Sequence, residues 1–215
     1  ETGHSVVVLT GPNHAEEVAR NIPTAALAAC ENKELAEMVQ TVLASDTFRV
    51  YTSPDVIGAE LGGAMKNVIA LCAGVCDGLG YGDNTKAMLM TRGLTEIARL
   101  GVALGGRQET FAGLSGIGDL MLTCSSIQSR NYRFGQLLSQ GMAVQEAMDS
   151  IGMVVEGYHV TGTAYELAGS LNVDMPIVTQ AYEVLYKGKN PKLALQDLMA
   201  RPKRHESEEI WLESK

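Results

Sequence analysis

The sequence predicts an α/β segment followed by a mainly α-helical domain. Strand and helix patterns alternate over the first part of the chain, an order typical of α/β folds. After Ser53 the pattern changes to long helical stretches with short Gly-containing breaks and no further strand alternation. With 46% hydrophobic and 20% charged residues, the chain has the composition of a globular protein. We therefore divide it into residues 1–53, residues 54–202 and a charged, flexible tail at 203–215.

The N-terminal elements follow one another in a regular order. Strand and helix patterns alternate over residues 5–9, 15–20, 24–29, 33–43 and 47–51. This alternation predicts a parallel sheet, the second half of a Rossmann-like fold, because a complete doubly wound sheet would need earlier strands. The chain also begins Glu1-Thr2-Gly3-His4, without an initiating Met. We therefore expect it to be a fragment of a longer product.

The helical region begins with an N-terminal helix signal. Ser53-Pro54-Asp55 fits an N-cap, a first-turn Pro and an early acid, so we predict a helix from there to about Gly78. A second helix, capped by Asn84, should end at Gly105-Gly106. Helical spacing predicts further helices at about 129–140, 143–150, 160–171, 176–187 and 191–200.

Charge and cysteine content exclude several classes of function. The net charge is -8 and the basic residues are scattered singly, which excludes a nucleic-acid binder because such a protein needs a basic face. No uninterrupted apolar run of about 18 residues and no signal-peptide core is present, so we expect no stable membrane insertion. We expect reduced, partly buried thiols, no metal and a cytoplasmic location, because no CxxC pair or zinc spacing connects Cys30, Cys72, Cys76 and Cys124.

The most informative stretch surrounds Lys66, in the middle of the first long helix. On its helix face Lys66 has only very small neighbours, which are Ala59, Gly62, Gly63, Ala70 and Ala73. Mid-helix Gly costs about 1 kcal/mol relative to Ala, so two together require a close approach. Either a neighbouring helix packs there backbone to backbone or a ligand does, and the central lysine favours a ligand. A partly desolvated lysine can exchange a proton with an alcohol or carbonyl oxygen near neutral pH, which a dehydrogenase requires.

A second candidate site is Ser129-Arg130-Asn131, directly before an amphipathic segment. A Ser N-cap, free backbone N–H groups and an Arg in the first turn form a compact anion site that suits a phosphate. The alternative is a capped surface helix with a solvated Arg130.

A third candidate is Asp119, which follows the Gly-rich stretch 113–118. We expect this stretch to be a flexible loop that delivers Asp119 to the start of the next helix. Asp119 then serves as an N-cap, binds a substrate hydroxyl or holds the Lys66 ammonium. The Gly-rich stretch 78–83 follows a helix rather than a strand, so it is not a dinucleotide fingerprint. Thr10-Gly11-Pro12-Asn13 lies between a strand and a helix, the right place for a ligand-binding turn.

Several longer motifs follow one another along the chain: Gly11-Pro12 with Ala15-Glu16-Glu17, Asp55-Val56-Ile57-Gly58, Glu60 to Ala70, Asp77-Gly78-Leu79-Gly80, Thr91-Arg92-Gly93-Leu94, Gly118-Asp119-Leu120, Ser129-Arg130-Asn131, Val155-Glu156-Gly157 and Met175-Pro176-Ile177. In this order and spacing they resemble the glycerol-3-phosphate dehydrogenase family, specifically the bacterial enzymes that make sn-glycerol 3-phosphate for phospholipid synthesis. The resemblance covers nearly all of residues 5–200.

The resemblance implies a fold, a reaction and a set of site residues. It implies the C-terminal part of an NAD(P)-binding Rossmann-like domain, then a helical domain of the 6-phosphogluconate dehydrogenase C-terminal type, in a homodimer. Lys66 resembles the family's catalytic proton acceptor, which accepts a proton in the oxidation of sn-glycerol 3-phosphate and donates one in the reduction of dihydroxyacetone phosphate by NADH or NADPH. Besides Lys66, the residues that resemble substrate ligands are Gly11, Asn13, Asn67, Asp119, Ser129, Arg130 and Asn131. Those that resemble cofactor contacts are Ala15, Arg130, Val154 and Glu156.

The chain departs from the family pattern at a few points. Asn13 replaces the usual hydroxyl residue, and His14 stands where Phe is common. The family's Gly-rich phosphate loop and a substrate-binding lysine would lie upstream of Glu1, so we expect the chain by itself to bind dinucleotide weakly and to be inactive. Two other functions compete with this one: a related hydroxy-acid dehydrogenase, and a non-catalytic helical dimerisation module in which the Gly62-Gly63 strip is only a helix contact.

Overall fold

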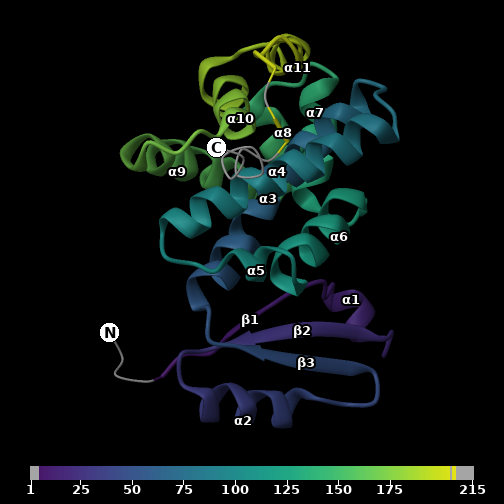
Figure 1. Cartoon of the computed structure of the whole chain (residues 1–215). Helices are drawn as coiled ribbons and strands as arrows, with labels where there is room; N and C mark the ends of the chain where they lie inside the picture. The colour runs from purple at the N-terminus through teal and green to yellow at the C-terminus, as the bar shows by residue number, and fades with distance from the viewer. Residues whose placement is uncertain (1–4, 204, 207–215) are drawn as a thin grey trace, which may run out of the picture.

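The computed structural model, which describes residues 5–203, 205 and 206, begins with a small mixed sheet (Figure 1). Its strands lie in the order β1 (Val8–Thr10), β2 (Thr24–Ala29) and β3 (Phe48–Ser53). β2 and β3 are parallel, whereas β1 runs antiparallel to β2. The predicted α/β start of the chain is confirmed, but the expectation of a wholly parallel sheet is wrong at β1.

The connections between the strands explain this difference. A parallel crossover has to return along the length of a strand, and β2 with its six residues spans about 20 Å. Helix α2 (Lys33–Leu43) has 11 residues, which cover about 16 Å and carry the chain back from β2 to β3. Helix α1 (Ala15–Val18) has only four residues, about 6 Å, so β2 returns beside β1 in the opposite direction.

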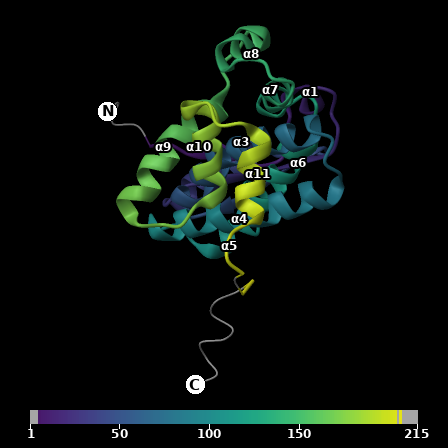
Figure 2. The same cartoon turned by 90° about the horizontal axis from the view of Figure 1, so that it is seen from above.

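The rest of the described chain is helical and lies on one side of the sheet (Figure 1). α2 packs on one face of the sheet, and η1 and α3 reach it from the helical side. Seen from above, α9, α10 and α11 lie side by side, while α8 projects from the opposite part of the bundle (Figure 2). The elements are α3 (Val56–Gly78), α4 (Asp83–Ala103), α5 (Gln108–Phe111), the π-helical turn η1 (Leu114–Gly118), α6 (Asp119–Ser125), α7 (Arg130–Ser139), α8 (Val144–Ile151), α9 (Glu156–Leu171), α10 (Pro176–Lys187) and α11 (Pro191–Met199).

Helix α3 is the central helix of this bundle, in contact with α4, α6, α7 and α9. It packs on α7 almost backbone to backbone: a Cβ atom on Gly74 would lie 1.9 Å from the Tyr132 carbonyl oxygen, and one on Gly135 would lie 2.0 Å from that of Leu71. By length and composition α3 is also the one described helix that could span a membrane, yet 56% of its most apolar stretch is buried within the fold. Such an apolar helix, buried on most sides, is the core helix of a globular domain.

The N-terminal caps of α3 and α4 differ from the predicted ones. Asp55, not Ser53, caps α3: its Oδ1 accepts from the Gly58 N–H at 2.9 Å. Asp55 Oδ2 also accepts from the Arg107 N–H at 2.8 Å and from the Thr110 hydroxyl at 2.5 Å. Burial raises the pKa of Asp55, but these hydrogen bonds outweigh it and hold the pKa below its usual value. The carboxylate therefore ties the start of α3 to α5 and its N-cap Arg107.

The remaining boundaries agree with the predicted ones to within a few residues, with three exceptions. α4 begins at Asp83 with Gly82 as its N-cap, so Asn84 is not the cap. α9 begins at Glu156 rather than at 160, because an acidic residue in the first turn extends it favourably. Two short helices, α5 and α6, occupy a region where the spacing predicted only one helix start. The predicted tail at 203–215 lies largely outside the described residues.

All four cysteines are free, as expected. Cys30, Cys76 and Cys124 are buried and Cys72 is partly so. Burial raises the pKa of Cys76 to about 11 and that of Cys124 to about 12, so these thiols stay protonated. The described residues contain no cluster of His, Cys, Asp and Glu that could hold a metal ion.

Candidate active site

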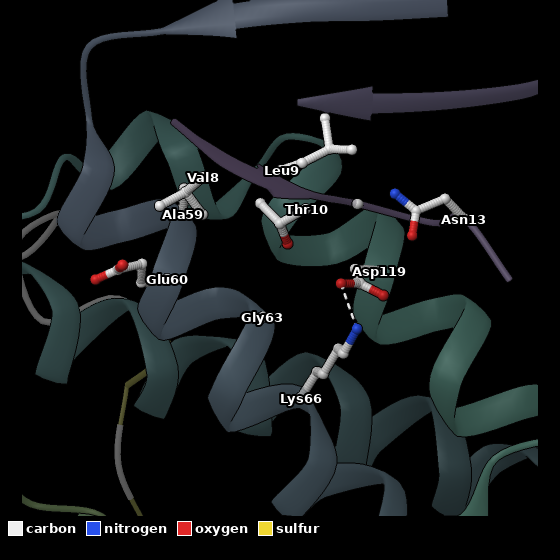
Figure 3. Close-up of a pocket in the computed structure, with 10 residues that line it drawn as sticks. Val8, Leu9, Thr10, Asn13, Ala59, Glu60, Gly63, Lys66 and Asp119 are labelled. Carbon is white, nitrogen blue, oxygen red and sulfur yellow. Dashed lines mark hydrogen bonds and ion pairs between the residues drawn. The ribbon is translucent and has the colours of Figure 1, made fainter. Parts of the chain in front are cut away.

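A pocket of about 290 Å³ opens between β1 and α3 (Figure 3). β1 and the turn after it form one side, and α3 and the start of α6 form the other. The pocket brings together four predicted site residues that are far apart in the sequence: Gly11, Asn13, Lys66 and Asp119. The remaining lining residues are Val8, Leu9, Thr10, Ala59, Glu60 and Gly63.

The two glycines before Lys66 are explained by contacts within the chain. A Cβ atom on Gly62 would lie 2.2 Å from the Ser115 carbonyl oxygen, so Gly62 admits the backbone of η1 rather than a ligand. A Cβ atom on Gly63 would lie 3.0 Å from the Thr10 hydroxyl, so Gly63 lets β1 approach α3 at the pocket. The expectation that a ligand approaches the whole small-residue strip is therefore wrong at Gly62.

The stretch before Asp119 is not the flexible loop that its glycines suggested. Residues Leu114–Gly118 form the π-helical turn η1, in which Ser115 is fully buried. A Cβ atom on Gly116 would lie 2.0 Å from the Phe111 carbonyl oxygen, so the glycine serves tight packing rather than mobility. α6 begins at Asp119 as predicted, with Gly118 as its N-cap, so Asp119 is not itself the cap.

Lys66 and Asp119 form a close ion pair at the base of the pocket (Figure 3). The Lys66 Nζ lies 2.5 Å from Asp119 Oδ2, and the side chains are 21% and 3% exposed. The Thr123 hydroxyl donates to the Asp119 backbone carbonyl oxygen at 2.7 Å and lies 3.4 Å from its Oδ1. Burial raises the pKa of Asp119, while the Lys66 ammonium, Thr123 and the Gly11 backbone oppose this effect. Of the roles considered for Asp119, the structure bears out the one of holding the Lys66 ammonium.

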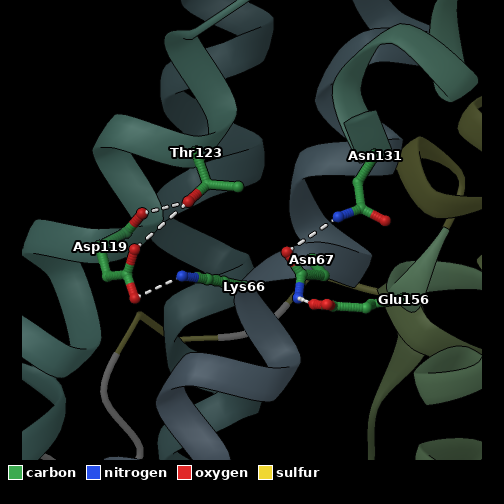
Figure 4. A network of polar contacts seen from close by, with 6 residues as sticks. All are labelled: Lys66, Asn67, Asp119, Thr123, Asn131 and Glu156. Carbon is green, nitrogen blue, oxygen red and sulfur yellow. Dashed lines mark hydrogen bonds and ion pairs between the residues drawn. The ribbon is translucent and has the colours of Figure 1, made fainter. Parts of the chain in front are cut away.

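The next residue, Asn67, belongs to a second polar network on the other side of α3 (Figure 4). Its Nδ2 donates to Glu156 Oε2 at 2.8 Å, and its Oδ1 accepts from Asn131 Nδ2 at 2.9 Å. Asn131 Oδ1 in turn accepts from the Gly157 N–H at 2.8 Å. Asn67 and Asn131 are both buried. This network joins α3, α7 and the first turn of α9.

The predicted anion site lies at the start of α7. Ser129 is the N-cap, as predicted, and its hydroxyl accepts from the Tyr132 N–H at 3.3 Å. The Arg130 side chain is 33% exposed, and its Nη2 lies 3.8 Å from Glu156 Oε1. A helix N-terminus with a partly exposed guanidinium can bind an anion such as a phosphate. Ser129, Arg130 and Asn131 do not line the pocket, and Asn131 is hydrogen-bonded to Asn67, the neighbour of Lys66 in the chain.

Two predicted cofactor contacts stand apart from both networks. Ala15 is exposed at the start of α1, and Val154 is 63% exposed just before α9. Sequence reasoning placed Thr10, which lines the pocket, in a candidate ligand-binding turn without giving it a role. It missed Thr123, which supports Asp119. Thr123 lies four residues after Asp119, one helical turn away, and that spacing was the available signal.

Comparisons with known proteins agree with this arrangement. The family model for the NAD-dependent glycerol-3-phosphate dehydrogenase C-terminus matches residues 55–196, and that for the N-terminus matches residues 1–36. Glycerol-3-phosphate dehydrogenases [NAD(P)+] from Desulfitobacterium hafniense and Moorella thermoacetica are 55% and 58% identical over 97% and 94% of this chain. The crystal structure of glycerol-3-phosphate dehydrogenase from Coxiella burnetii superposes with a TM-score of 0.88 at 43% identity, over 91% of this chain and 60% of that one. The chain spans 59% and 61% of the length of the two curated relatives.

Proposed function

Because this chain belongs to the NAD-dependent glycerol-3-phosphate dehydrogenase family, we propose that the full-length gene product reversibly reduces dihydroxyacetone phosphate to sn-glycerol 3-phosphate with NADH or NADPH, feeding glycerophospholipid synthesis. The observation that carries the proposal is the Lys66 ammonium, held at 2.5 Å by Asp119 in a pocket between β1 and α3. A positioned ammonium at this place can serve a carbonyl reduction as a proton donor.

The nicotinamide ring has to lie beside Lys66 for this reaction. Val8 and Leu9 of β1 are apolar side chains in an otherwise mostly polar lining, and they can contact one face of such a ring. When bound, NADH or NADPH supplies the hydride, and NAD+ or NADP+ accepts it in the reverse direction. Lys66 donates a proton to the nascent alkoxide oxygen during reduction and takes it back during oxidation. Asp119 holds the Lys66 Nζ in place at the pocket through their 2.5 Å contact.

The substrate needs a phosphate site and contacts to its hydroxyl and carbonyl oxygens. We assign the phosphate to Arg130 and to the N-terminus of α7 behind Ser129, because charge-assisted hydrogen bonds and the helix dipole both favour an anion there. Gly11 and Asn13 line the pocket and suit the polar atoms nearest the reacting carbon. We assign Asn67 and Asn131 to the edge of the same substrate site.

We further propose Ala15, Arg130, Val154 and Glu156 as cofactor contacts, residues 1–53 as the C-terminal part of an NAD(P)-binding domain, and residues 54–202 as the catalytic domain. We place the protein in the cytoplasm as a homodimer. The small-molecule substrate and the family support these assignments, and the exposed positions of Val154 and Glu156 leave both accessible to a ligand.

Turnover by the full-length gene product tests the proposal. We expect NADH or NADPH oxidation with dihydroxyacetone phosphate, followed as the loss of absorbance at the reduced nicotinamide band, and no comparable rate with keto acids. A faster reaction with a carboxylate substrate than with the phosphate would favour a hydroxy-acid dehydrogenase. No turnover with either class would contradict the proposal and favour a helical module without catalysis.

A further inference from the structure

The network on the α9 side of α3 has a defined direction (Figure 4). A backbone N–H can only donate, so the Gly157 N–H requires an oxygen from Asn131. The Nδ2 of Asn131 then donates to the Oδ1 of Asn67. The Nδ2 of Asn67 in turn donates to Glu156. The carboxylate of Glu156 can only accept. A donor at one end and an acceptor at the other therefore fix the orientation of both carboxamides.

The network is also tight enough to transmit a displacement. Asn67 and Asn131 are 4% and 6% exposed, so a carboxamide that loses its partner stays unsatisfied rather than turning to water. A Cβ atom on Gly157 would lie 2.6 Å from the Asn67 carbonyl oxygen and 2.9 Å from Asn131 Oδ1. The first turn of α9 thus touches the α3 backbone directly, at the residue next to Lys66.

Glu156 is the solvent-accessible member of the network, and Lys66 lies next to its member Asn67 in the chain. The Glu156 side chain is 54% exposed and lies 3.8 Å from Arg130, so a ligand can reach it and compete for both partners. Lys66 extends from the opposite side of α3 to Asp119 (Figure 4). A ligand at the start of α9 and a ligand in the pocket therefore act on neighbouring residues of one helix.

We propose that Asn131, by joining the first turn of α9 to Asn67, is a positioning residue that couples ligand binding at Glu156 to ligand binding beside Lys66. This inference rests on the proposed function only for the identity of the two ligands, a dinucleotide and a phosphate ester. We call Gly157, Asn131, Asn67 and Glu156 the relay. When a phosphate binds Arg130, it replaces Glu156 as the anion beside the guanidinium. Glu156 then keeps its hydrogen bond from Asn67 and can contact the dinucleotide.

The test measures the dissociation constant of NADH on the full-length gene product with and without saturating sn-glycerol 3-phosphate. Both ligands are in their reduced forms, so the ternary complex cannot react. We expect the phosphate ester to tighten NADH binding at least about 5-fold in the wild type, which is a typical size for coupling between sites. Glu156→Ala, which removes an exposed end of the relay, should bring this ratio to within about twofold of 1.

Two matched controls separate coupling from simple contact. Glu156→Gln should keep the ratio within about twofold of the wild-type value, since its amide oxygen still accepts from Asn67. Asn131→Asp removes the donor to Asn67 and should abolish the coupling, whereas Asn32→Asp, the same change at the N-cap of α2, should leave it unchanged. If Asn131→Asp does not fold, the two Glu156 variants still test the coupling, because the side chain that they change is exposed.

The outcomes are distinct. Equal weakening of NADH by Glu156→Ala with and without the phosphate ester would mean a direct contact only and would overturn the relay. A wild type that turns over substrate but shows a ratio of 1 would overturn the relay and leave the proposed function standing. A wild type that binds no NADH at all would contradict the proposed function and the relay together.

Discussion

The two sides of α3 hold their polar side chains in different ways. On the pocket side Lys66 and Asp119 are charged, and Lys66 keeps 21% of its side chain exposed. In the network on the α9 side the buried side chains are the neutral carboxamides of Asn67 and Asn131, and the carboxylate of Glu156 is half exposed. Burying an ion pair carries a large desolvation cost, whereas a fully hydrogen-bonded amide can be buried cheaply. The comparison indicates that ionisable side chains lie at the pocket, whereas neutral carboxamides connect α3 to α7 and α9.

The largest expected effect is a loss of turnover when only the pocket side of α3 is changed. Lys66→Met in the full-length gene product should lower kcat for dihydroxyacetone phosphate roughly 10²- to 10⁴-fold, because the proton donor is lost while the side-chain length is kept. The matched control is Lys86→Met. Lys86 is 27% exposed and paired with Asp77 and Asp83, but it lies outside the pocket. Steady-state kinetics and circular dichroism of both variants check this. Equal losses in the two variants would contradict a catalytic role for Lys66.

Glu96 is a second buried carboxylate, and it differs from Asp119 because its hydrogen-bond donors are backbone N–H groups rather than a lysine. Glu96 of α4 is 3% exposed and accepts from the N–H groups of Ile177 at 2.8 Å and Val178 at 3.2 Å, at the start of α10. Burial raises its pKa from 4.5 to about 7, while these hydrogen bonds and Arg99 act in the opposite direction. Glu96 therefore remains largely protonated in mildly acidic solution.

This difference predicts a pH dependence of stability. The folded state binds the Glu96 proton more tightly than the unfolded chain, so the contribution is complete below pH 4.5 and is lost as the pH rises through about 7. The loss amounts to roughly 3 kcal/mol. Urea unfolding of the wild type and of Glu96→Gln at pH 4.5 and 7.5 should show the wild type losing more stability by about that amount. Parallel pH curves for the two proteins would contradict the assignment.

The smallest expected effect concerns two helix caps. Ser129→Ala and Asn32→Ala each remove a side-chain N-cap, of α7 and α2 respectively, and each should lower the free energy of unfolding by about 1 kcal/mol. Only Ser129→Ala should also weaken binding of sn-glycerol 3-phosphate, because its helix start carries the proposed phosphate site. Calorimetric titration and thermal unfolding measure both quantities. The same phosphate affinity in both variants would leave Ser129 with a structural role alone.

Local patterns predicted most elements, because caps, glycines and hydrophobic spacing act within a few residues. The Ser129 cap, the start of α6 at Asp119 and the central position of Lys66 on a long helix were all read in this way. The antiparallel β1 was not, because strand direction depends on how far α1 can carry the chain. The packed turn η1 was not either, since Gly116 packs against Phe111 and, across the fold, Gly62 of α3 admits the Ser115 carbonyl.

The sequence by itself therefore determined the chemical groups, the helices that carry them and the family of the protein. Only the tertiary structure decided which groups meet. The pairing of Lys66 with Asp119 crosses 53 residues, and that of Asn67 with Glu156 crosses 89. Such contacts leave no local pattern, because they depend on how α3 packs against α6, α7 and α9 at once.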